Sequence, residues 1–240
     1  MIEAARAELL SPDTLQVGIN LGNILLVTGK AENGDPEGIA PDMGQALAER
    51  LGVEVQYQTF ATPGEVTDAA QRNEIDVGLI ANEPKRAIVI DFCDPYVEIE
   101  ATYLVPAGSS LQTVEDVDAP GVGIAVSERA AYDLYLSRTL QHATLHRARG
   151  LSGALKLFVD EELDALAGLV PALKENAKSV PGSRVIPGRY TSVQQAIGTL
   201  HGRPALNIEV QAFLEEKKAN GFVAGLINKH GVTGKLQVAK

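Results

Sequence analysis

Residues Ile75–Tyr96 read IDVGLIANEPKRAIVIDFCDPY and are the most informative part of the chain about its fold. It begins with an apolar run typical of a buried strand and passes through the short loop 81–85 to a lone cation at Arg86. A second apolar run then leads to a Pro- and Asp-containing segment that favours a change of direction. A guanidinium at the carboxyl end of a strand suits recognition of a planar anion such as a carboxylate. The alternative is a surface ion pair between Arg86 and Asp91 or Asp94.

Outward from this stretch, segments with strand and helix patterns alternate along the chain. Strands are predicted at 15–19, 53–57, 75–80, 122–126, 144–148 and 163–168, and two successive strands at 190–195 and 195–199. Helices are predicted at 42–51, 65–72, 131–139, 153–161, 170–178 and 205–219, the first capped by Asp42, the third by Ser127 and the fourth by Ser152. This alternation favours an α/β fold with mainly parallel sheets and right-handed crossovers.

Bulk properties narrow the function classes. The 240 residues are enough for one large or two small cores, and 45% hydrophobic with 22% charged residues is typical of a globular protein. The net charge of −10 disfavours nucleic acid or an anionic membrane surface as a partner. A single cysteine excludes an internal disulfide, and both Cys93 and Tyr132 fit core positions better than functional ones. The amino-terminal segment MIEAARAELLSPDTL lacks the plan of a secretory signal, so a signal was either removed or never present.

Motifs for the commonest cofactors and nucleophiles are not found. The sequence holds no G-x-S-x-G elbow, no Walker loop and no G-x-G-x-x-G after a strand, and its four histidines are scattered. We therefore expect no cofactor and no metal.

The opening stretch resembles a known family. A strand, Pro-x-Arg, an apolar run and D-F-x-D-P-Y resemble the signature of the amino-acid type (family 3) extracellular solute-binding proteins of ABC transporters. The segment PEGIAPDMGQALAERLG also resembles that family, and the resemblance extends from about Leu15 to about Gly231. It implies a type II periplasmic-binding-protein-like fold, with two α/β lobes that two hinge strands join around a ligand cleft. Lobe one would be 1–96 plus 196–240 and lobe two 101–190, with hinges at 97–100 and 191–195.

The resemblance also implies ligand-binding residues in lobe one. Arg86 falls at the family's carboxylate-binding position. The family has a Thr or Ser pair before this arginine, whereas this chain has a shorter loop with Ala81 near that place and Asn82 as a possible replacement. Asn23 holds about the position of a residue, often aromatic, that lies against the ligand, and Gln195 is a weaker candidate on the second hinge strand.

We expect different roles for the two asparagine side chains of the turn Asn20-Leu-Gly-Asn23. We expect Asn20 to bond its own backbone, as turn asparagines do, and Asn23 to contact the ligand.

In lobe two, the family's Gly-Thr-Thr type loop meets the ligand carboxylate. Here Ser127, Glu128 and Arg129 stand in its place, at the start of a helix whose positive end can bind an anion. The family's next strand ends with an Asp that holds the ligand ammonium, but this chain has Gly168 and Leu169 there. Because a buried ammonium without a partner is costly, the ligand is expected to be carboxylate-bearing or polar without a cationic amine.

The predicted function is a non-catalytic, monomeric solute-binding protein. It would deliver a small ligand to the membrane permease of an ABC transporter, in the periplasm. One alternative is a cleft enzyme resembling cyclohexadienyl dehydratase, with Glu83, Glu100 or Glu128 as conceivable general acids. Another is a cytoplasmic ligand-sensing protein.

Overall fold

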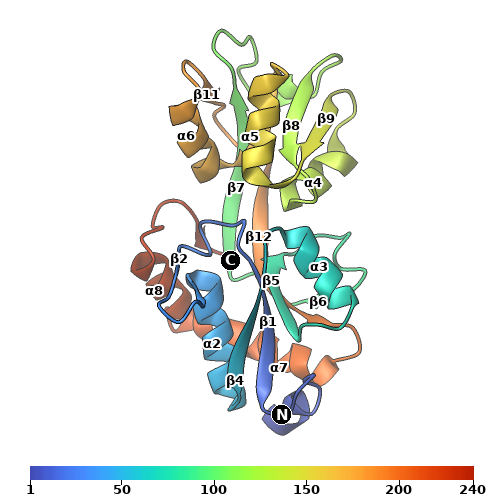
Figure 1. Cartoon of the computed structure of the whole chain (residues 1–240), viewed down its shortest axis with the longest axis vertical. Coiled ribbons are helices and arrows are strands. Elements are labelled where there is room, and N and C mark those ends of the chain that lie inside the picture. Colours follow the sequence, from blue (N-terminus) through green and yellow to red (C-terminus); the bar gives the residue numbers. More distant parts are fainter. The chain divides into compact units, whose positions relative to one another are not determined.

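The computed structural model describes the whole chain, residues 1–240. The chain forms two compact units, unit 1 (residues 1–98 and 194–240) and unit 2 (residues 99–193). Two strands run from one unit into the other, β7 (Val97–Val105) and β12 (Thr191–Leu200), and both are labelled in Figure 1. One continuous strand, β12, therefore replaces the two successive strands that the sequence predicted for residues 190–199.

Unit 1 holds a sheet in the order β4-β1-β5-β12, in which β1 pairs in parallel with both β4 and β5, and β12 pairs antiparallel to β5. Its helices and remaining strands follow the chain as α1 (Ile2–Arg6), β1 (Thr14–Asn20), β2 (Gly29–Lys30), β3 (Pro36–Glu37), α2 (Ile39–Leu51), β4 (Glu54–Phe60), α3 (Pro63–Gln71), β5 (Val77–Ala81), β6 (Ile90–Phe92), α7 (Pro204–Ala219), α8 (Phe222–Lys229) and β13 (Gln237–Val238).

The opening stretch of the sequence lies in the middle of this sheet. Every residue of β5 is buried, as its unbroken apolar run predicts for a strand covered on both faces. Asp76, which precedes β5, is fully buried and accepts hydrogen bonds from the backbone N–H of Leu10 at 2.7 Å and of Gln16 at 2.8 Å. Its carboxylate also pairs with Arg203 at 2.6 Å. The start of β5 is thus fixed to the amino-terminal segment and to the start of α7.

Helix α2 begins earlier than the sequence predicts. It starts at Ile39 and is capped by Gly38, so the expected capping role of Asp42 is wrong. Gly38 has φ 147°, and a Cβ there would lie 2.2 Å from the Leu26 carbonyl oxygen, so only glycine fits this close approach. Asp42 instead accepts hydrogen bonds from Lys229 and His230, which lie at the end of α8.

Unit 2 is a second α/β body, with its strands in the order β7-β10-β8-β9. The pairs β10–β8 and β8–β9 are parallel, whereas β7 runs antiparallel to β10. Figure 1 labels most of its elements, which are the 3₁₀ turn η1 (Glu115–Val117), β8 (Gly123–Ser127), α4 (Ala131–Thr139), β9 (Thr144–Ala148), α5 (Gly150–Asp160), β10 (Ala165–Leu169), α6 (Val170–Ser179) and β11 (Arg184–Val185).

The core of unit 2 forms where α5 and α6 meet this sheet. Phe158 and Ala154 of α5 pack with Leu173 of α6 and with apolar residues of β7, β8 and β10. Helix α5 begins at Gly150, so Ser152 lies within its first turn and is not its cap, contrary to the sequence prediction. The predicted strands at 122–126, 144–148 and 163–168 are confirmed as β8, β9 and β10, with boundaries that differ by at most two residues.

Candidate functional site

The candidate residues of unit 1 lie at one edge of its sheet. Strands β1 and β5 are parallel, with Val17 opposite Val77 and Ile19 opposite Leu79, so both end at the same edge. Ala81 ends β5, and Asn23 lies three residues beyond the end of β1. The carboxyl edge of a parallel sheet is where α/β proteins gather their ligand contacts.

Arg86 is held in a tight turn directly after β5. Its backbone N–H donates to the Glu83 carbonyl at 2.9 Å, and its own carbonyl accepts from Ile90 at 3.1 Å. The side chain folds back, and Nη1 donates to the Ala81 carbonyl at 2.7 Å. Because only 3% of Arg86 is exposed, the alternative of a surface ion pair is wrong.

Ala81 and Gln195 lie side by side as register partners on β5 and β12. The Asn82 backbone N–H donates to the Gln194 carbonyl at 2.8 Å, which extends this pairing by one residue. Gln195 is 6% exposed, whereas Asn82 is exposed. Unit 1 therefore brings these candidates and Arg86 together around the end of β5.

Asn23 makes a local contact that the sequence analysis assigned only to Asn20. The Asn20 side-chain oxygen accepts from the Gly22 N–H at 3.0 Å, as predicted. The Asn23 side-chain oxygen in turn accepts from the Leu25 N–H at 3.2 Å, and the residue is 7% exposed. Both asparagines thus stabilise the loop after β1, and one side of the Asn23 amide is already engaged.

The candidate residues of unit 2 come from the ends of β8 and β10. Ile124 pairs with Ala165 and Ala125 with Leu166, so the parallel register brings Ser127 level with Gly168 two residues further on. Helix α4 starts at Ala131 and its capping residue is Ala130, so the predicted cap at Ser127 is wrong. Ser127 is 5% exposed, whereas Glu128 and Arg129 are exposed.

The backbone N–H groups of the loop 128–130 are engaged within unit 2. Glu128 donates to the Ala148 carbonyl at 2.9 Å, Arg129 to the Asp133 carboxylate at 2.8 Å and Ala130 to the Ser127 carbonyl at 3.1 Å. These three amides therefore already have acceptors, which weakens the expectation that this part of the helix start receives an anion.

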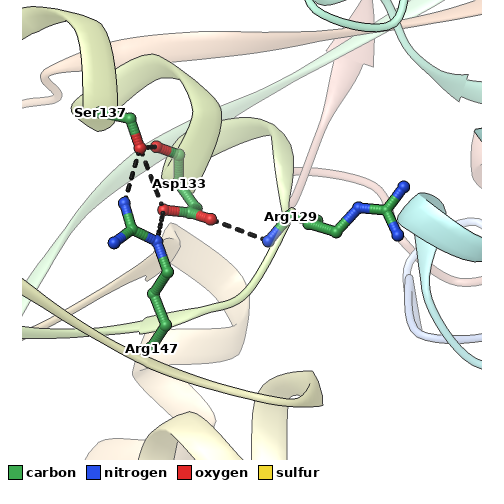
Figure 2. A network of polar contacts seen from close by, with 4 residues as sticks. All are labelled: Arg129, Asp133, Ser137 and Arg147. Atoms are coloured by element: carbon green, nitrogen blue, oxygen red, sulfur yellow. Dashed lines mark hydrogen bonds and ion pairs between the residues drawn. The ribbon is translucent and has the colours of Figure 1, made fainter.

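A polar network that the sequence analysis missed holds this loop (Figure 2). The buried Asp133 carboxylate accepts from Arg147 Nε at 2.9 Å and from Ser137 Oγ at 3.3 Å. Arg147 also donates to Ser137 Oγ at 2.8 Å. Arg129 has φ 59°, in the left-handed region, and its side chain extends away from the network in Figure 2. The one signal in the sequence was the spacing of Asp133 and Ser137 on a single helical face.

The end of β10 offers no acidic side chain. Gly168 and Leu169 belong to a strand whose residues are all buried. A Cβ at Gly168 would lie 2.9 Å from a Leu173 methyl group, so a larger residue there requires that side chain to move. Leu169 is 9% exposed and is the capping residue of α6, without a side-chain hydrogen bond.

Three further features were considered: a metal site, the single thiol and membrane-spanning helices. No group of three or more histidine, cysteine, aspartate or glutamate side chains is arranged to hold a metal ion. Cys93 is 5% exposed, and burial raises the pKa of its thiol to about 12, which confirms the core position expected for it. None of the helices has both the length and the apolar character needed to cross a bilayer.

Comparisons with known proteins agree with the geometry. The family model of the bacterial extracellular solute-binding proteins, family 3, matches residues 15–233. The amino-acid-binding protein AabA of Dichelobacter nodosus is 20% identical over 227 residues, which cover 90% of this chain and 88% of that protein.

Two solved structures extend the likeness to three dimensions. A mutant of ArgBP from T. maritima has a TM-score of 0.76 at 23% identity, covering 95% of this chain and 99% of that one. The ancestral amino acid-binding protein AncCDT-1, a precursor of cyclohexadienyl dehydratase, has a TM-score of 0.76 at 25% identity, covering 93% and 97%. The predicted type II fold built of α/β units is confirmed. Because the family model matches nearly the whole chain, this protein belongs to the bacterial extracellular solute-binding proteins, family 3.

Proposed function

We propose that this protein binds a small carboxylate-bearing solute, related to an amino acid but without a cationic amine, and delivers it to an ABC-type permease. The observation that carries this proposal is Arg86, a buried guanidinium whose contact with the Ala81 carbonyl fixes it at the end of β5. Arginine presents paired N–H donors in a planar fork that matches a carboxylate.

Unit 1 would supply the anchor and its surroundings. Ala81 and Gln195 form the rigid strand pair beside Arg86, and Asn82 and Asn23 offer amide groups from the loops at the same edge. A site built on paired strands keeps its donors in place, so little ordering is needed when the solute binds.

Unit 2 would supply neutral contacts from Ser127, Gly168 and Leu169, with Glu128 and Arg129 exposed beside them. Since the end of β10 carries no acid, an ammonium group would be buried there without a partner, at a cost of several kcal/mol. This favours a deaminated or amide-bearing relative of an amino acid over a standard α-amino acid.

The names of similar proteins support a solute related to amino acids, while the lack of an amine rests on the missing acid at the end of β10. AabA and AncCDT-1 are amino-acid-binding proteins, and AbpA of Streptococcus pneumoniae, whose structure contains L-arginine, is described as an ABC transporter substrate-binding protein. We propose the same transport role here, as a monomer in the periplasm or outside the cell, with residues 97–100 and 191–195 as hinges. We favour binding over the dehydratase alternative, because the family is one of solute-binding proteins and the relative AabA is named an amino-acid-binding protein.

A thermal-shift screen of carboxylates, amides and amino acids tests the proposal, since a ligand that binds only the native state raises the melting temperature. Carboxylates without an amine should raise it most, and Arg86→Ala should abolish the response while the protein still folds. Arg189→Ala is a suitable control, because Arg189 is an exposed arginine whose ion pair with Glu100 lies within unit 2. An unchanged response in Arg86→Ala, or equal losses in both variants, would reject Arg86 as the anchor.

A further inference from the structure

Three tyrosine rings pack together in unit 2. Tyr190, directly before β12, lies 4.6 Å from Tyr103 of β7 and 6.0 Å from Tyr135 of α4, measured between ring centroids. Such tilted and stacked pairs stabilise one arrangement of the rings. The Tyr190 hydroxyl is therefore held in place by its ring, whether or not the hydroxyl itself makes a hydrogen bond.

Two hydroxyls in this region are buried without a hydrogen-bond partner, those of Tyr132 and Tyr190. Tyr132 lies in the first turn of α4 and is only 4% exposed. Buried polar groups in native proteins are nearly always bonded, so two orphans in one unit need an explanation such as a ligand or a bound water. Burial raises the pKa of both phenols, so both keep their protons at neutral pH and can donate as well as accept.

Ser127 brings a third hydroxyl to the same place. It is 5% exposed; burial raises the pKa of Tyr132, and a polar contact with the Ser127 side chain lowers it by a smaller amount. The geometry nevertheless leaves the Tyr132 hydroxyl without a hydrogen bond to it. Tyr132 lies one helical turn before Tyr135 on α4, and therefore shares a face with the ring against which Tyr190 packs. Burial is the main cause that raises the pKa of Tyr190, and Tyr132 adds to it.

We infer that Ser127, Tyr132 and Tyr190 form a neutral hydrogen-bonding subsite that receives an uncharged polar group of the solute, an amide or a hydroxyl. This inference rests on the proposed function and narrows its solute class to carboxylates with such a group at the other end. Amides and alcohols both donate and accept, which matches protonated hydroxyls that can do the same.

Charged groups fit this subsite less well. Burial and, to a smaller extent, the Asp133 carboxylate raise the pKa of Tyr132, and an anion would meet both the burial and that negative charge. An ammonium would need a carboxylate with open acceptor positions, yet Asp133 already accepts from the Arg129 N–H, from Arg147 and from Ser137 (Figure 2). A neutral group avoids both problems.

The test compares two series of carboxylates on the purified protein. Succinamate, glutaramate and adipamate each carry a terminal amide, and in the matched isosteres an isopropyl group replaces the carboxamide. Dissociation constants are measured for the wild type, Tyr132→Phe and Tyr190→Phe, with Tyr135→Phe as the control from the same ring cluster. The Tyr135 hydroxyl is not among the buried hydroxyls that lack a partner.

We expect the wild type to prefer at least one amide over its isostere by about tenfold, the scale of a well-placed hydrogen bond. Tyr132→Phe and Tyr190→Phe should each remove most of that preference without lowering the melting temperature of the solute-free protein, because each removes an unbonded hydroxyl. Tyr135→Phe should keep the preference.

Several results would overturn the inference. A wild type that binds both series equally has no amide subsite, although the anchoring role of Arg86 would stand. Phe variants that keep the preference but melt at lower temperature would show that the hydroxyls serve the fold or a bound water only. A wild type that binds no carboxylate of either series would overturn both the inference and the proposed function.

Discussion

The network around Asp133 should control the stability of the loop that leads into α4. Asp133→Ala removes the acceptor of the Arg129 N–H, a contact of the kind made by a helix cap, which contributes about 1 kcal/mol. It also removes the bond from Arg147 Nε, and hydrogen bonds to charged groups contribute about 1.5–3 kcal/mol. Because the Arg147 side chain is 41% exposed and can be hydrated, the lower part of that range applies. The expected loss is about 2–3 kcal/mol in the free energy of unfolding.

Urea unfolding followed by tyrosine fluorescence measures this loss. The chain has no tryptophan, and four of its six tyrosines (Tyr103, Tyr132, Tyr135 and Tyr190) lie in unit 2, so the signal reports mainly on that unit. Amide hydrogen exchange adds a local readout, since the Arg129 N–H should exchange faster in Asp133→Ala.

A matched control is Asp160→Ala, which removes a carboxylate from an exposed ion pair with Lys156 on α5 of the same unit. Exposed pairs of this spacing contribute only about 0.3–0.5 kcal/mol. A loss below about 0.5 kcal/mol in Asp133→Ala, or unchanged exchange at Arg129, would refute the view that this network holds the loop.

Three further predictions concern the end of β10, a surface histidine and the start of β5. Leu169→Asp should allow L-glutamine to raise the melting temperature, because the new carboxylate can pair with its ammonium group. The aspartate can also cap α6, which offsets about 1 kcal/mol of the apolar burial that is lost. A folded variant that does not respond to L-glutamine would contradict the view that the missing acid excludes amines. The hydrogen bond with the Ile88 carbonyl, opposed by burial and aided by Asp91, raises the pKa of His201. The stabilisation by protonated His201 is therefore complete below the unfolded pKa of about 6.5 and is lost as the pH rises through the raised pKa. His201→Gln should lower the melting temperature more at about pH 5.5 than at about pH 8.5, and an equal decrease at both pH values would contradict this. Asp76→Ala should cost about 3–5 kcal/mol of unfolding free energy, because it leaves a largely buried Arg203 without its carboxylate; a loss within 1 kcal/mol on urea titration would speak against that.

The local pattern of apolar and polar residues was enough to predict most of the helices and strands. The apolar run after Ile75 predicted a buried strand, and β5 is buried throughout. The alternation of strands and helices gave parallel pairing of β1 with β4 and β5 and of β8 with β9. Helix starts were less predictable. Gly38 precedes α2 because its backbone lies so close to Leu26 that no side chain would fit, and Leu26 lies outside the helix.

The fold class, the family and the candidate position of Arg86 were predictable before folding was considered, because they depend on residue type, spacing and short-range pattern. The burial of Arg86, the ion pair of Arg147 on β9 with Asp133 on α4, and the packing of the Tyr190 ring against Tyr135 were visible only in the folded chain. The physical reason is that burial and side-chain partners depend on elements that come together only on folding, and nothing in the residues next to Asp133 or Tyr190 specifies which distant side chain each will meet.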